Sequence, residues 1–100
     1  MAIREVVVRT RPNTSVNFSA PIENGLPDTW GVLELASGEL ISFDESFSAD
    51  GLTKTVTTIF RDEEARTDYN DNSIFKSVMN TVKAKDVNNN ITKTVTITEV

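Results

Sequence analysis

β-Branched residues are the feature of this sequence that most restricts its fold. Thirteen threonines, eleven valines and seven isoleucines make up nearly a third of the 100 residues. These side chains are stiff about χ1 and favour the pleated backbone of a strand over a helix. We therefore expect a β-sheet to dominate the structure. A chain of this length buries roughly 60 to 70% of its unfolded surface, enough for one core, so we expect residues 1–100 to form a single domain.

Alternating hydrophobicity identifies four strands. Residues 2–11 are apolar on both faces near their middle, which is typical of a central strand. Residues 40–47 and 52–60 alternate on either side of the turn-forming residues Ser48 to Gly51 and predict a β-hairpin. Residues 91–100 alternate again, with isoleucine and valine on one face and threonine on the other. Residues 13–27 contain the turn formers Pro21, Asn24-Gly25 and Pro27 and are interpreted as a loop.

Two further regions have helical patterns. In residues 28–37, Asp28 or Thr29 can cap a helix and Gly38 can end it, whereas the alternative is a strand that turns back at Gly38. We favour the helix. After residue 61, an acidic first turn predicts a helix start, and residues 70–73 interrupt it. An amphipathic stripe then follows at helical spacing, formed by Phe75, Val78, Met79 and Val82.

The order strand, helix, strand, strand, helix, strand is the βαββαβ ferredoxin-like pattern. It predicts an α+β fold with a four-stranded antiparallel sheet in the order 4-1-3-2 and with both helices on one face. The helical stripe is then expected to pack on the inner faces of the strands, against Phe43, Val56, Phe60 and Val95, with Ile41 and Phe47 on the same side as Phe43.

The sheet face opposite the helices is rich in threonine and also carries valines of the first strand. Threonine can line a solvated face, or it can pack against a second sheet with few polar groups left unpaired. The apolar residues on this face favour contact, so we predict a protein-protein interface there, between two copies of the chain or with another protein. The expected interface residues are Thr55, Thr57, Ile59, Thr94 and Thr96.

The absence of histidine and cysteine excludes catalytic triads, redox thiols and the usual zinc sites. The acidic residues of 62–71 lack the pattern of a calcium loop. The net charge of −5 argues against a nucleic-acid partner, and Arg9 and Arg11 are interpreted as solvated residues at a strand end. No apolar run could cross a membrane, and the N-terminal residues do not resemble a signal peptide. We expect neither a metal nor a cofactor.

Residues 50–69 (DGLTKTVTTIFRDEEARTDY) are similar to the strand-into-helix passage of dimeric α/β-barrel proteins of the antibiotic-biosynthesis-monooxygenase-like group. Together with residues 2–14 (AIREVVVRTRPNT) they also resemble short proteins of large tailed marine phages. The monooxygenase-like resemblance implies an apolar cavity for polycyclic aromatics, with Asn, Trp or His near the substrate. Here only Trp30 and Asn17 offer such groups, and we interpret Trp30 as a core anchor and Asn17 as a turn residue.

Two functions follow from these observations. The first is a non-catalytic structural or assembly protein of a phage, located in the virion or the host cytoplasm, which acts through a homo-oligomer or through other virion proteins and has no catalytic residues. The alternative is a cofactor-free monooxygenase-like enzyme or small-molecule binder with a lumen between paired sheets. A sealed interface favours the first, and a pocket of a few hundred Å³ with converging polar groups favours the second.

Overall fold

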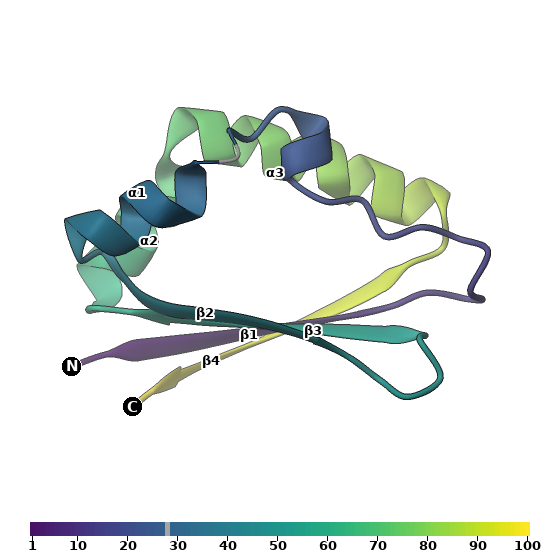
Figure 1. Cartoon of the computed structure of the whole chain (residues 1–100), viewed down its shortest axis with the longest axis horizontal. Coiled ribbons are helices and arrows are strands. Elements are labelled where there is room, and N and C mark those ends of the chain that lie inside the picture. Colours follow the sequence, from purple (N-terminus) through teal and green to yellow (C-terminus); the bar gives the residue numbers. More distant parts are fainter. Residues whose placement is uncertain (28) are drawn as a thin grey trace.

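Four antiparallel strands form one sheet in the order β2-β3-β1-β4, which confirms the predicted order. They are β1 (Ile3–Thr10), β2 (Leu40–Phe47), β3 (Thr53–Phe60) and β4 (Thr92–Glu99). This computed structural model describes residues 1–27 and 29–100, and of Val32 the backbone alone. Both termini lie at the same end of the sheet (Figure 1). β1 pairs with β3 on one side and with β4 on the other, so the strand with two apolar faces is central, as its pattern indicates.

Helices cover one face of this sheet (Figure 1). They are a short 3₁₀ helix η1 (Ile22–Asn24), α1 (Trp30–Ser37), α2 (Glu63–Asp71) and α3 (Ser73–Asn88). In the described part of the chain, no helix covers the opposite face (Figure 1). The ferredoxin-like α+β fold is therefore confirmed.

The segment with two alternative predictions is a helix. α1 ends at Gly38, whose φ of 80° is left-handed and whose amide donates to the carbonyl of Leu35, as the pattern predicts. Thr29 occupies the N-cap but makes no side-chain capping bond. Asp28, the other candidate cap, lies outside the described residues.

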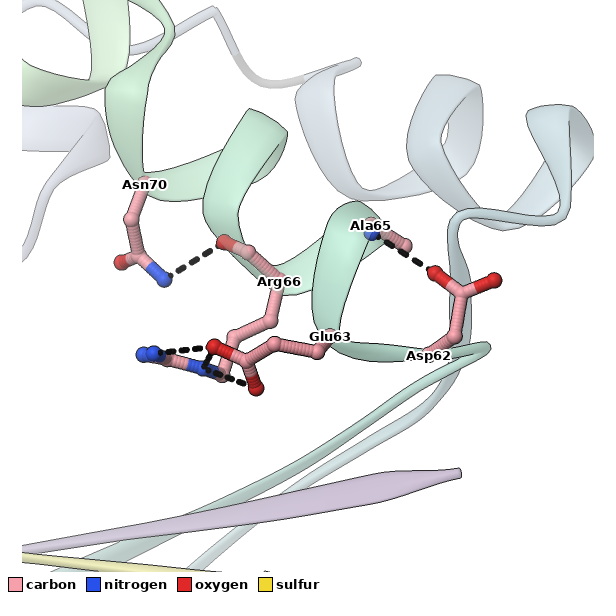
Figure 2. A network of polar contacts seen from close by, with 5 residues as sticks. All are labelled: Asp62, Glu63, Ala65, Arg66 and Asn70. Atoms are coloured by element: carbon pink, nitrogen blue, oxygen red, sulfur yellow. Dashed lines mark hydrogen bonds and ion pairs between the residues drawn. The ribbon is translucent and has the colours of Figure 1, made fainter. Parts of the chain in front are cut away.

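Side chains at the acidic start of α2 make hydrogen bonds and an ion pair within the helix (Figure 2). Asp62 accepts a hydrogen bond of 2.8 Å through Oδ1 from the amide of Ala65, which caps the helix. The carboxylate of Glu63 contacts the Arg66 guanidinium at 2.7 Å. Asn70 donates to the Arg66 carbonyl one turn later. Asp62, Glu63 and Asn70 thus make these hydrogen bonds within the helix itself.

Asn72 separates α2 from α3 and caps the second helix, which confirms the predicted break. Its backbone leaves the helical region, with φ −55° and ψ 129°. Its side-chain Oδ1 accepts from the amides of Ile74 at 3.0 Å and Phe75 at 3.2 Å. The break sets the direction in which α3 crosses above the sheet.

Replacing Asn72 with alanine should destabilise the protein by about 1 kcal/mol, because two amides of the first turn lose their acceptor. Asn72→Asp restores an acceptor at the same position and should retain most of the stability. Urea unfolding followed by circular dichroism measures both variants. Equal stabilities for Asn72→Ala and the unmodified protein would contradict the capping role.

One strand position differs from the prediction. The register between β2 and β3 shifts between Leu40 and Ser42, which makes Ile41 an extra, unpaired residue. Leu40 instead takes the inward place, at 2% exposure, while Ile41 is 53% exposed. A β-bulge of this kind reverses side-chain parity along a strand, so the prediction that Ile41 shares the inner face with Phe43 is wrong.

The interior is divided between two clusters of buried residues. Leu26, Val78 and Val82 form one, with Trp30, Phe75 and Met79 packed against it. Leu40, Phe60 and Ala65 form the other, with Tyr69 against it. The amphipathic stripe of α3 does face inward, as predicted.

None of the four predicted partners of that stripe is among the described residues packed in its cluster; they are Phe43, Val56, Phe60 and Val95. The stripe packs on Leu26 of the loop that precedes α1. Phe43 and Val95 of the sheet remain 53% and 46% exposed, so the expected direct packing of α3 on these two residues is wrong. A cavity lined by Phe75 and Met79 of α3 and by Phe43 of β2 lies between the two layers.

Candidate functional site

A cavity of about 660 Å³ lies between the helices and the sheet. Its floor comes from the inward-facing residues of the strands, including Val7, Phe43 and Val56, and its roof from α1, α2, α3 and the loop before α1. The cavity is open to solvent on one side, so it is not a sealed void in the core. The space is therefore one for solvent or for a ligand, and its volume is typical of small-molecule sites.

Four aromatic residues line this cavity, each next to at least one of the others, and we call them the aromatic cluster: Trp30, Phe60, Tyr69 and Phe75. The rings of Trp30 and Phe75 are stacked, with centroids 5.9 Å apart and an interplanar angle of 13°. Tyr69 meets Trp30 edge-on at 5.8 Å and approaches Phe75 to 4.5 Å. Phe60 joins the group from β3, 5.2 Å from Tyr69. Such a wall suits a flat apolar molecule, because aromatic faces prefer stacked or edge-on partners.

Charged side chains enter the same cavity from the sheet. The Arg9 Nε atom lies 3.1 Å from Asp86 Oδ2, and these side chains are only 11% and 7% exposed. The Lys54 ammonium lies 3.5 Å from Glu45 Oε2. Glu5 and Lys93 also line the cavity. The apolar walls thus have polar groups at one side, which can orient a ligand.

Two groups of the cavity have shifted pKa values. Burial raises the pKa of the Tyr69 hydroxyl above its usual value, and the carboxylates of Glu34, Glu5 and Glu39 add to this. The Tyr69 side chain is thus neutral across the physiological range. Partial burial lowers the pKa of the Lys93 ammonium, and the neighbouring Arg9 charge lowers it further, against the opposing effect of Glu5 and Asp86.

The interpretation of Arg9 and Arg11 as solvated residues is wrong. Arg9 is paired with Asp86, 77 residues away in the chain. Arg11 donates from Nε to the carbonyl of Gly51 and from a terminal nitrogen to that of Val16, and its guanidinium lies 4.9 Å from the centre of the Phe18 ring. The sequence did indicate that Arg9 faces inward, because it has the same strand parity as Val7. It could not show that Asp86 would be the partner of Arg9, because the two residues are far apart in the chain.

The two residues singled out by the family resemblance lie in different environments. Trp30 packs on the Leu26 cluster, as a core anchor would, and also lines the cavity. Asn17 is exposed and is not among the cavity residues. Two other asparagines, Asn70 and Asn80, do line it; sequence reasoning missed them because their helical positions alone do not show what they face.

The predicted interface residues share the sheet face opposite the cavity. Val8 pairs with Thr55 on one side and with Thr94 on the other, and Val6 pairs likewise with Thr57 and Thr96. Opposite partners in a sheet point to the same side. Ile59 continues the patch, opposite Arg4. The five predicted residues therefore surround two valines on a face that the described helices leave bare.

No protein-family model matches the sequence, and no curated protein matches it. Solved structures do match. A conserved protein of Bacteroides thetaiotaomicron, named as a possible oxidoreductase, has a TM-score of 0.70 at 14% identity over 99% of this chain and 97% of its own. SnoaB, a cofactor-independent oxygenase from Streptomyces nogalater, has a TM-score of 0.65 at 12% identity over 99% and 92%. A dimeric ferredoxin-like protein from an uncultured marine organism has a TM-score of 0.61 at 14% identity over 99% and 94%.

The shared fold is that of dimeric ferredoxin-like proteins. Antibiotic biosynthesis monooxygenases are also among the solved structures with this fold, which agrees with the resemblance noted from the sequence. Two of the solved structures with this fold are named as dimeric ferredoxin-like proteins.

The prediction that this chain is not an enzyme is overturned by these neighbours, several of which are named as monooxygenases or as a possible oxidoreductase. The error arose from equating the absence of histidine and cysteine with the absence of chemistry. A cavity that binds a substrate able to react with dioxygen needs neither residue. The comparisons give no support to a phage origin or to a place in a virion. Within residues 1–27 and 29–100, no helix is long and apolar enough to cross a membrane.

Proposed function

We propose that this chain is a cofactor-independent oxygenase that binds a planar polycyclic aromatic substrate between its helices and its sheet. The observation that carries this proposal is the cavity of about 660 Å³ walled by the aromatic cluster. The name of SnoaB, a neighbour of the same fold, supports the reaction class. The cavity lies on the helix side of the sheet, not in the lumen between paired sheets that the sequence led us to expect.

The proposed reaction converts an activated methylene of a hydroxylated aromatic ketone into a carbonyl. The methylene loses a proton to a cavity carboxylate, Glu5 or Glu45, and the resulting carbanion reduces dioxygen. A carbon-oxygen bond forms as a hydroperoxide, and loss of water leaves the quinone, so that R₂CH₂ and O₂ give R₂C=O and H₂O. The four electrons come from the methylene carbon, and the peroxide takes up the proton that the carboxylate had accepted.

Trp30 provides a direct test, because it is the only tryptophan of the chain and lines the cavity. Titration with a tricyclic anthrone should quench its fluorescence with a dissociation constant on the order of 10 µM or lower. Incubation in air should then consume one dioxygen for each quinone formed. An unchanged emission and no dioxygen uptake would rule the proposal out.

A pair of valine variants places the binding in the cavity. Val7→Phe adds bulk to the cavity floor and should weaken binding of the anthrone at least about tenfold. Val87→Phe makes the same change at a helix position that is 67% exposed and should have no effect. Equal affinities of the two variants would show that the anthrone binds elsewhere.

We further propose that the chain is a homodimer whose subunits meet through the threonine- and valine-rich sheet face. The patch around Val6 and Val8 is contiguous by strand register. Burying its apolar area contributes roughly 25 cal/mol per Å², and threonine hydroxyls can bond across the seam or to trapped water. The two sheets then form the centre of the dimer, with one cavity on the outer side of each.

A further inference from the structure

Three basic side chains occupy one row across the floor of the cavity. Arg9 on β1 pairs with Lys54 on β3 and with Lys93 on β4, and all three line the cavity. We call them the basic row. Residues directly opposite each other in antiparallel strands have Cβ atoms about 4.5 to 5.5 Å apart, and like charges in such positions are destabilising. The row therefore requires negative charge beside it.

The chain supplies close partners for two of the three. Asp86 pairs with Arg9 and Glu45 with Lys54. Lys93 takes part in none of the ion pairs found among the described residues. Lys76 of α3, which also lines the cavity, takes part in none of them either. Lys93, the exposed outer end of the basic row, thus has no close ion pair among the described residues, and the carboxylates of Glu5 and Asp86 act on it only from farther away.

The charge of the cavity is opposite to that of the chain. The sequence has 15 acidic and 10 basic residues. The cavity lining has two acidic residues, Glu5 and Glu45, against four basic ones, which are the basic row and Lys76. A cleft with apolar walls concentrates the field of such charges and attracts ligands of opposite sign.

We propose that the ligand of this cavity is an aromatic acid, whose rings lie against the aromatic cluster and whose carboxylate pairs with the basic row through Lys93. This inference rests on the proposed function, because it assigns a charged group to the planar substrate of the same cavity. It also defines which end of the substrate faces the edge strand β4. A carboxylate there would give Lys93 an anionic partner, as Asp86 is for Arg9 and Glu45 for Lys54.

Two probes of equal ring size test the charge separately from the rings. Anthracene-2-carboxylate and its methyl ester are titrated into the protein, and quenching of Trp30 emission reports binding. The acid should bind about tenfold more tightly than the ester, as expected for one charge-assisted contact. The preference should shrink at high salt, because the cavity is open to solvent on one side.

A pair of lysine variants identifies the partner of the carboxylate. Lys93→Gln should reduce the ratio of acid to ester affinity to about one, since one ion pair accounts for the preference. Lys85→Gln makes the same change at an exposed position of α3, outside the cavity lining and not among the charges that act on Lys93, and should leave the ratio unchanged.

The outcomes separate this inference from the function on which it rests. Equal affinities of acid and ester overturn the aromatic acid while leaving the aromatic cavity supported. Binding of neither probe overturns the proposed function itself. A preference for the acid that survives in Lys93→Gln overturns the role of Lys93, and a preference that disappears there but not in Lys85→Gln supports it.

Discussion

Replacing Val78 with aspartate should cost at least about 4 kcal/mol of folding free energy and leave much of the protein unfolded at room temperature. Val78 is 6% exposed and lies in the cluster with Leu26 and Val82. A carboxylate at that position would be removed from water without a partner. Domains of this size have only about 5 to 15 kcal/mol of stability in total, so one such change removes a large part of it.

The same substitution on the other side of the helix is the control. Val87 is 67% exposed on α3, and Val87→Asp should change stability by no more than about 0.5 kcal/mol. Thermal unfolding followed by circular dichroism compares the two variants with the unmodified protein. If Val78→Asp does not fold at all, Val78→Ala should still lower stability measurably, by about 2 kcal/mol. Melting curves of Val78→Asp and Val87→Asp that coincide would show that the Leu26 cluster is not part of the core.

Replacing Thr55 and Thr94 together with arginine should dissociate the proposed dimer without altering the circular dichroism spectrum. Both residues flank Val8 on the bare sheet face, and they lie on different strands, β3 and β4. Two copies of the variant would bring four guanidinium groups into the seam, where they lose water and repel one another. A stable dimer of standard size buries about 800 Å² on each partner, and these charges would lie within that area.

A matched double variant controls for the added charge. Thr67→Arg with Thr81→Arg introduces the same side chains at exposed positions of α2 and α3, away from the sheet face, and should remain dimeric. Multi-angle light scattering on a size-exclusion column measures the mass of each protein. A monomeric mass for the unmodified protein at tens of micromolar, or an unchanged dimer in Thr55→Arg with Thr94→Arg, would exclude this face as the interface.

The local pattern of the sequence was sufficient for the secondary structure and for most of the topology. Strand periodicity assigned Val7, Val56 and Phe60 to one face and Thr55 and Thr94 to the other, and the register agrees. The glycine at position 38 and the asparagine-rich break before α3 ended and began helices where expected. These features depend on a residue and its near neighbours, so the sequence determines them directly. The bulge at Ile41 was missed because no local residue type requires it.

The candidate site depended on contacts between distant parts of the chain. The stripe on α3 showed that one helix face is buried, but not that Leu26, and not the predicted sheet residues, would pack against it. Arg9 found its partner Asp86 at a separation of 77 residues.

The periodicity of a sequence shows on which face of a strand or helix each side chain lies. The sequence by itself therefore determined the inner and outer faces of the strands and helices, including the threonine-rich sheet face that no described helix covers. The cavity, its aromatic wall and the charges on its floor were decided only by the tertiary structure. Two packed layers are separated by a distance that depends on all the loops and side chains between them, and so does the pairing of charges across them. A local sequence pattern reports only on neighbouring residues, so it could not predict either of these.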